Sequence, residues 1–106
     1  LARALAIDPD VVLLDEPLNN LDMAHAVHMM RHLRSIATEL GRTVVIVLHD
    51  INFAGAYADR ICAMKHGQVQ AFGTPEEIMR SDVLTSIFDT PVDVIPSHRG
   101  PVAVYF

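Results

Sequence analysis

The sequence predicts an α/β fold in which parallel strands are joined by a crossover helix. Val11–Leu14 is an apolar run bounded by Pro9 and Pro17, which indicates a short strand buried on both faces. A second run of this kind, Thr43–Leu48, follows an amphipathic segment over residues 23–40. Because a strand, a helix and a strand of these lengths are typical of a βαβ unit, we expect the strands to be parallel with a right-handed crossover.

Composition narrows the class of protein. The chain has 106 residues, 51% of them hydrophobic and 20% charged, which is typical of one globular domain with a single core. The formal net charge of -5, with no basic block, argues against nucleic acid as the main partner. No apolar run approaches the length needed to cross a bilayer. Cys62 is the only cysteine, so an internal disulfide is excluded, and we expect it to be a small core residue in a reducing compartment.

The first residues predict the tail of a helix. Leu1–Ile7 is rich in alanine and leucine and stops at Asp8-Pro9, where proline restricts the preceding residue. The chain has no capping residue in front of this segment, and Leu1 is not an initiator methionine. We therefore expect the chain to be a piece of a longer protein.

The long segment after the first strand predicts a helix. Asp22 is a good N-cap and Gly41 lies where a left-handed residue ends a helix. Apolar residues recur at helical spacing: Met23, Val27, Met30, Leu33, Ala37 and Leu40. On another side lie His25, His28 and His32, whose spacing could hold a divalent metal. Imidazoles on a solvated face are the ordinary explanation of this spacing, and we assign no metal site.

Polar residues follow both predicted strands. Asp15-Glu16 follows the first strand and His49-Asp50 follows the second. Parallel strands end at the same edge of a sheet, where α/β proteins bind ligands, and neighbouring strands lie about 5 Å apart. Two adjacent carboxylates are unfavourable at the end of a buried strand unless a cation or a proton donor binds them. A helix cap or a solvated turn would also explain the pair. A phosphate with a bound metal ion would be one such ligand of the carboxylates.

The second half of the sequence predicts helices and strands shorter than the helix over residues 23–40. Asp50 caps a helix over residues 51–58, with Phe53, Ala54 and Tyr57 as its packing face. Residues 60–65 and 68–72 form a hairpin around His66-Gly67, a turn suited to positive φ angles.

A capping box and a second hairpin complete the predicted chain. Thr74 and Glu77 form the box, with Pro75 at the first helical position. A short helix follows over residues 81–88. Residues 92–95 and 102–106 are expected to be two strands around a turn at 96–101.

Together these segments resemble the ATP-binding-cassette (ABC) ATPases. The matching motifs, in family order, are "ARAL", "VVLLDEP", "NNLD", "VVIVLHD" and "GTPEEI". Asp15-Glu16 resembles the Walker B motif, Asn19–Asp22 the D-loop and His49 the H-loop. The Asn19-Asn20 pair departs from the small residue that many members have before Leu-Asp. The resemblance implies part of a P-loop NTPase (RecA-like) core, followed by a β-hairpin and a small α+β tail.

The resemblance also implies a mechanism with ATP and Mg²⁺. Asp15 would hold Mg²⁺ through water, Glu16 would polarise the attacking water and His49 would contact the γ-phosphate. Asp22 would act across the interface of two ATP-sandwiching cassettes. A carboxylate at Glu16 can accept a proton from water, whereas an amide cannot.

The finer resemblance is to ATPase subunits of iron–siderophore importers, particularly those for catechol-type chelates. It rests on "DEPLNNLDM", "VLHDINFA" and the tail "VYF". It implies a homodimer of ATPase subunits, membrane permease subunits and, indirectly, a periplasmic or surface siderophore-binding protein as partners. It also implies a peripheral location on the cytoplasmic face of the inner membrane.

Three family motifs do not occur in this sequence: the P-loop GxxxxGK[ST], the signature loop and the glutamine-bearing segment. We therefore expect residues 1–106 to be the C-terminal part of one ABC ATPase domain, inactive alone and prone to self-association through an exposed sheet edge. Two alternatives stay open. A soluble ABC ATPase acting on nucleic acid or ribosomes fits the acidic composition poorly. A non-catalytic interaction remnant fits poorly with the intact Asp15, Glu16 and His49.

Overall fold

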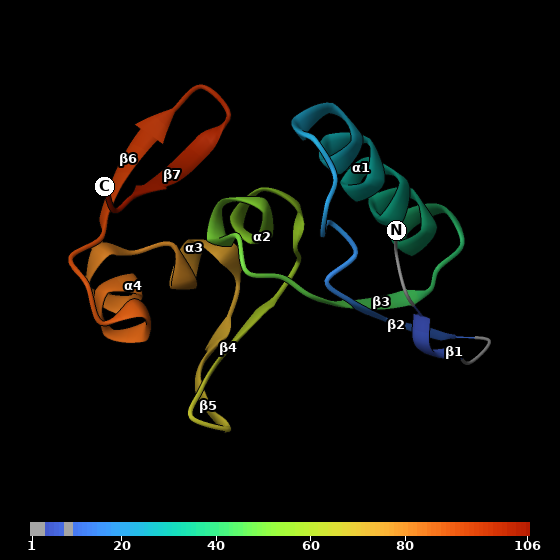
Figure 1. Cartoon of the computed structure of the whole chain (residues 1–106), viewed down its shortest axis with the longest axis horizontal. Helices are drawn as coiled ribbons and strands as arrows, with labels where there is room; N and C mark the ends of the chain where they lie inside the picture. The colour runs from blue at the N-terminus through green and yellow to red at the C-terminus, as the bar shows by residue number, and fades with distance from the viewer. Residues whose placement is uncertain (1–3, 8–9) are drawn as a thin grey trace. The chain divides into compact units, whose positions relative to one another are not determined.

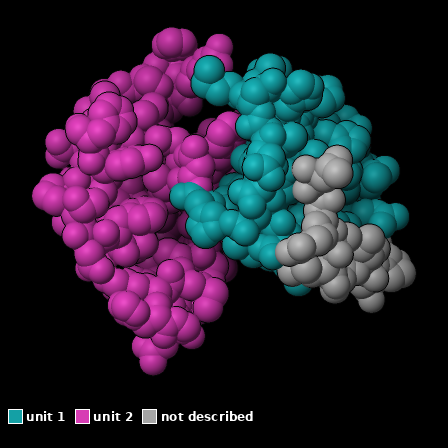
Figure 2. Space-filling model, viewed as in Figure 1, with its two compact units in different colours: residues 1–49 teal, residues 50–106 magenta. Residues whose placement is uncertain are grey.

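The computed structural model describes residues 4–7 and 10–106, with side chains described from residue 10 onward. The chain forms two compact units, residues 1–49 and residues 50–106, which are coloured teal and magenta in Figure 2.

The first unit is a three-stranded sheet with one long helix (Figure 1). Its elements are β1 (Ala4–Ile7), β2 (Val11–Asp15), α1 (Met23–Glu39) and β3 (Thr43–Val47), and the strand order is β1-β2-β3. The β2 and β3 strands are parallel, with Val11 opposite Thr43 and Asp15 opposite Val47. The predicted parallel pair with its connecting helix is thus confirmed.

The predicted helix at the start is wrong for residues 4–7, and residues 1–3 lie outside the described part. Ala4–Ile7 forms a strand antiparallel to β2. A helix this short is marginal whatever its alanine and leucine content. Pairing with β2 instead gives the backbone of β1 hydrogen-bond partners in a neighbouring strand.

The prediction that both strands are buried on both faces is also wrong. In β2, only Leu14 is buried, and along β3 exposed residues alternate with half-buried ones. Val45 and Val47 are 46% and 43% exposed. The sheet has three strands and a single helix in its unit, so alternate side chains of β3 face away from the packed side. Within the described part of the chain, β3 pairs with β2 alone and forms an edge of the sheet.

The predicted ends of α1 are confirmed. Asp22 is its N-cap, and Gly41, after the C-cap, has a φ of +63°. The buried residues of the helix are Ala26, Met30 and Leu33. The apolar stripe is shorter than predicted, because Met23 and Leu40 are 86% and 64% exposed at the two ends of the helix.

The second unit contains seven short elements. They are α2 (Ile51–Tyr57), β4 (Ile61–Lys65), β5 (Gln68–Gly73), α3 (Pro75–Ile78), α4 (Ser81–Phe88), β6 (Asp93–Ser97) and β7 (Gly100–Val104). Its core consists of Ile61, Ile78, Met79, Leu84, Val92 and Ala103. Ala54 of α2 packs against this core as predicted, while Phe53 and Tyr57 stack on each other with ring centroids 6.1 Å apart.

The predicted local signals of this unit are confirmed. The hairpin turn has positive φ at both His66 (+52°) and Gly67 (+74°). Thr74 and Glu77 form the capping box, with Pro75 in the first turn of α3. The last hairpin is tighter than predicted, because Pro96 pairs with Pro101 inside the ladder and only residues 98–99 turn.

Cys62 is exposed, so its predicted place in the core is wrong. Its neighbour Ile61 is buried in the core, and successive side chains of a strand point to opposite faces. Cys62 therefore lies on the outer face of the β4–β5 hairpin, paired across the strands with Phe72, which is 67% exposed.

Candidate functional site

The candidate site lies where β2 and β3 end. Because the two strands are parallel and Asp15 is opposite Val47, Glu16 and His49 emerge at the same edge of the sheet. There the Nε2 atom of His49 contacts the Oε1 atom of Glu16 directly. The sequence-based expectation that these two residues emerge at the same edge of the sheet is therefore confirmed.

The backbone of Glu16 has a positive φ angle. Its φ is +49°, a left-handed conformation that is uncommon for a residue with a side chain, and its N–H donates to the carbonyl of Val47 at 3.1 Å. Pro17, the next residue, is fully buried and holds the chain beyond the turn. Such backbone conformations cluster at functional sites, where the surrounding structure maintains them.

The Glu16 and His49 side chains differ in exposure. The Glu16 side chain is 32% exposed and that of His49 is 81% exposed. A carboxylate is an acceptor of hydrogen bonds and protons, and an imidazole can donate or accept, so the pair can move a proton at the edge of the sheet.

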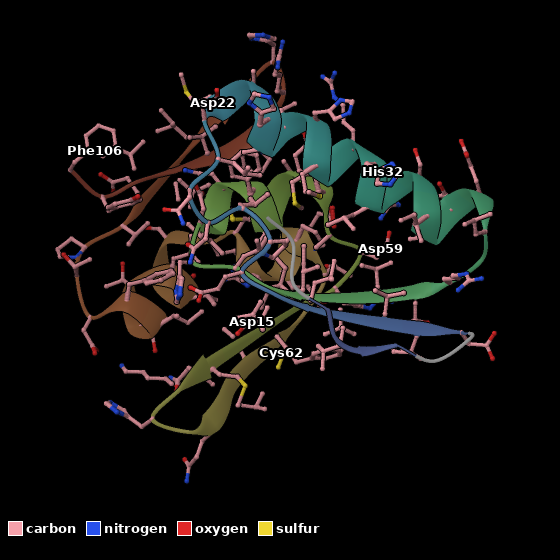
Figure 3. The ribbon with its side chains drawn as sticks, turned by 45° about the vertical axis from the view of Figure 1, so that its right-hand side comes forward. Asp15, Asp22, His32, Asp59, Cys62 and Phe106 are labelled. Atoms are coloured by element: carbon pink, nitrogen blue, oxygen red, sulfur yellow. The ribbon has the colours of Figure 1, made fainter. Side chains whose placement is uncertain are left out.

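Asp15, labelled in Figure 3, is the last residue of β2 and is half-buried. Residues 10–106 contain no cluster of three or more histidine, cysteine, aspartate or glutamate side chains that could hold a metal ion. Mg²⁺ does not require one, since it usually keeps several waters and takes only one or two carboxylates from the protein. A single carboxylate such as that of Asp15 fits Mg²⁺ in this respect.

Asp22 is the N-cap of α1, and Figure 3 shows it at the start of that helix. Its Oδ1 atom accepts a hydrogen bond from the His25 N–H at 2.8 Å and lies 2.8 Å from Nδ1 of the same residue. The backbone hydrogen bond first, and then the ring contact, hold the pKa of Asp22 below its ordinary value of 3.8. The carboxylate is therefore ionised at neutral pH. Its predicted role across a dimer interface stays a prediction.

The remaining histidines of α1 do not form a site. His28 and His32 are exposed, and the His25 ring is engaged by Asp22. No metal-binding group including them occurs in the described part of the helix. The solvated-face explanation fits them.

No protein-family model matches the chain. It is 58% identical over 104 residues to the petrobactin import ATP-binding protein FatE of Bacillus anthracis, covering 98% of this chain and 42% of that protein. It is 47% identical to the petrobactin import ATP-binding protein YclP of Bacillus subtilis, over 100% of this chain and 42% of YclP. The hemin import ATP-binding protein HmuV of Rhodococcus jostii is 46% identical over 90% of this chain and 32% of its own length.

Two solved structures share the fold. An inward-facing putative metal-chelate type ABC transporter superimposes with a TM-score of 0.77 at 25% identity, covering 92% of this chain and 39% of that one. The second, cbiO1 of Clostridium perfringens, part of the ABC transporter complex cbiONQ, has a TM-score of 0.63 at 34% identity over 73% of this chain and 31% of its own. The chain is therefore similar to ABC transporter ATPases over nearly its whole length.

The chain spans about two fifths of the length of the petrobactin import proteins that it matches. Within the described residues, no helix is long and apolar enough to cross a membrane.

Sequence reasoning missed one residue of this chain that connects segments far apart in the sequence. Asn52, in the first turn of α2, hydrogen-bonds the backbone of Ala103 on β7 with both ends of its side-chain amide. Its two partners are 51 positions away along the chain, and no local pattern predicts such a pairing. An asparagine inside a helix, where its propensity is poor, was the only available signal.

Proposed function

We propose that this chain carries the catalytic residues of the ATP-hydrolysing subunit of an ABC importer. The observation that supports it best is the direct contact between Glu16 and His49 at the carboxyl edge of two parallel strands. Glu16 accepts the proton of the attacking water, and His49 orients that carboxylate and contacts the terminal phosphate of ATP. The family relationship supports the same assignment.

The other two acidic residues have supporting roles in this proposal. Asp15 holds Mg²⁺ through water, and the ion supplies charge stabilisation to the phosphates when it is bound. Asp22, ionised and fixed as a helix cap, acts at the interface with a second ATPase subunit. The P-loop motif does not occur in residues 1–106, so we expect this segment alone neither to bind ATP tightly nor to hydrolyse it.

We propose an iron chelate as the transported substrate, and a catechol-type siderophore in particular. The similar proteins are named for the import of petrobactin and hemin, and the two with the highest identities quoted above are both petrobactin importers. The partners are then a second copy of the subunit, membrane permease subunits and, indirectly, a siderophore-binding protein. The subunit works as a peripheral protein on the cytoplasmic face of the membrane.

The catalytic proposal is tested by Glu16→Gln in the protein produced from its complete reading frame. The amide keeps the size of the side chain but cannot accept a proton, so turnover should be abolished while ATP still binds. Glu39→Gln is the matched control, because Glu39 is exposed at the end of α1, and its turnover should equal that of the wild type. Unchanged turnover in Glu16→Gln would remove Glu16 from the role of base.

The substrate proposal needs a separate measurement in cells. Uptake of radioactive iron supplied as petrobactin or as hemin is compared with and without the gene. Loss of petrobactin uptake alone supports a siderophore importer. Loss of hemin uptake alone contradicts the siderophore assignment and leaves the catalytic one standing.

A further inference from the structure

The segment between β2 and α1, residues 16–22, begins with a closed turn. The Asn19 N–H donates to the Glu16 carbonyl at 3.2 Å, and this hydrogen bond closes a four-residue β-turn. Pro17 is at the second position of that turn, where its fixed φ is favoured. Because the Glu16 N–H is bonded to the Val47 carbonyl, the start of the turn is attached to the sheet.

A second turn overlaps the end of the first. The Leu21 N–H donates to the Leu18 carbonyl at 3.2 Å. Asn20, the third residue of this turn, has a φ of +65°, whereas the φ of Asn19 is negative. A positive φ at the third position is typical of a type II turn, where glycine or asparagine is favoured. The backbone of Asn20 therefore gives this turn its shape.

The contribution of Asn20 comes from its backbone. Its side chain is exposed, and in the part of the chain that the structure describes it makes no hydrogen bond or ion pair. Asparagine is one of the few residues besides glycine that adopt the left-handed region readily, whereas a β-branched residue there is an outlier. The asparagine before Leu21-Asp22, where many ABC ATPases have a small residue, is thus explained by the backbone of the turn.

Asp22 follows the second turn directly. Its backbone is extended, with a φ of −73° and a ψ of 174°. Its Oδ1 atom accepts from the His25 N–H at 2.8 Å, and its carbonyl accepts from the Ala26 N–H at 2.9 Å. Asp22 is therefore bound to α1 on one side and joined to the turn on the other. The shape of the turn determines where the Asp22 carboxylate lies relative to Glu16.

We propose that Asn20 is a positioning residue for Asp22, because its left-handed backbone holds the turn that places the Asp22 carboxylate relative to Glu16. This inference rests on the proposed function of Asp22 at the interface with a second ATPase subunit. Glu16 acts on the attacking water, while Asp22 meets the other subunit. A turn of another shape would keep both carboxylates but misalign them.

The test changes Asn20 in two ways in the protein produced from its complete reading frame. Asn20→Val puts a β-branched residue where φ is positive, so the turn should rearrange and kcat should fall by roughly ten-fold. Asn20→Gly removes the same side chain but allows a positive φ, so kcat should stay within about two-fold of the wild type. The Kd for ATP should change in neither variant. Equal kcat values in the two variants would overturn the proposal.

A control separates positioning from a general loss of stability. His66→Val places the same β-branched residue at another exposed turn position with a positive φ, +52°, in the β4–β5 hairpin. Its kcat per ATP-binding site should equal that of the wild type, and a fall as large as in Asn20→Val would overturn the proposal. Asn20→Ala serves if Asn20→Val does not fold. Its kcat should lie between those of Asn20→Gly and Asn20→Val, or below that of Asn20→Gly if only that variant folds, and a wild-type value would overturn the proposal.

A double variant tests whether Asn20 acts through Asp22. Asp22→Asn keeps a helix cap, since asparagine caps about as well as aspartate, but removes the charge, so it should lower kcat alone. Adding Asn20→Val to Asp22→Asn should lower kcat by less than about two-fold more, because the two residues contribute to one interaction. A further loss as large as that of Asn20→Val in the wild-type background would overturn the proposal.

Amide exchange separates this inference from the proposed function. If Asp22→Asn turns over as the wild type does, the proposed function of Asp22 fails, and exchange measured by NMR still decides the positioning role. Asn20→Val should speed exchange of the Asn19 and Leu21 amides, which close the two turns, and Asn20→Gly should speed it less. Unchanged exchange of both amides in Asn20→Val would overturn the proposal.

Discussion

The proposed catalytic residues lie in the first of the two units of this chain, and a cluster of six buried apolar residues lies in the second. Residues 1–49 contain the Glu16–His49 contact, and β3 of the same unit leaves Val45 and Val47 more than two fifths exposed. Residues 50–106 contain a continuous buried core, in which Leu84 and Val92 are almost fully shielded.

The difference follows from how each unit is connected. The site is formed by the ends of two neighbouring parallel strands, so it needs only correct pairing and one crossover helix. The core of residues 50–106 is assembled by single residues from several short elements, including β4, α3, α4 and β7. None of these elements is long enough to be stable alone, and their stability comes from mutual burial.

The largest expected effect of a substitution on stability lies in the second unit. Leu84 is 0% exposed, so Leu84→Ala leaves a cavity and should lower the free energy of unfolding of residues 50–106 by about 3 kcal/mol. Hydrogen exchange measured segment by segment should show faster exchange in residues 50–106 and little change in residues 10–49. Equal acceleration in both units would break the comparison, because the chain would then unfold as one cooperative body.

A smaller effect is expected from the helix cap of the second unit. Thr74 accepts a hydrogen bond from the Glu77 N–H and completes the capping box, so Thr74→Ala should cost about 1 kcal/mol in thermal or urea unfolding. Thr90→Ala is the control, since Thr90 is exposed in the same unit and caps no helix. If both variants lower the free energy of unfolding equally, the capping box does not contribute to the stability of the second unit.

The smallest effect is expected on the exposed strand of the first unit. Val45→Thr keeps the branched shape of the side chain at a position that is 46% exposed. The free energy of unfolding should therefore fall by about 0.5 kcal/mol or less. The measurement is the same urea unfolding, read from the first unit by segment-resolved exchange. A loss as large as that of Leu84→Ala would show that Val45 is covered in solution, and the contrast between the units would disappear.

Much of this architecture follows from local sequence signals. The Asp22 cap, the His66-Gly67 turn and the Thr74–Glu77 capping box each depend on residues within a few positions of one another. The parallel pairing of β2 and β3 follows from two apolar runs separated by one helix. That pairing was enough to predict that Glu16 and His49 lie at the same edge of the sheet, because parallel strands end together. The direct contact between their side chains was seen only in the structure.

Other features depended on contacts between distant segments. The strand at residues 4–7 forms by pairing with β2, against the helix preference of its own residues. The exposure of Cys62 and of the β3 valines depends on which face of each strand is covered.

The sequence by itself therefore determined the caps, the turns and the pair of strand ends that carries the candidate site. Only the tertiary structure decided which apolar side chains are buried, and that the Asn52 side-chain amide completes the edge of β7. The physical reason is how far apart the interacting residues lie along the chain. Capping and turn hydrogen bonds are made between neighbours in the chain, whereas burial and edge pairing depend on segments that meet only when the chain folds.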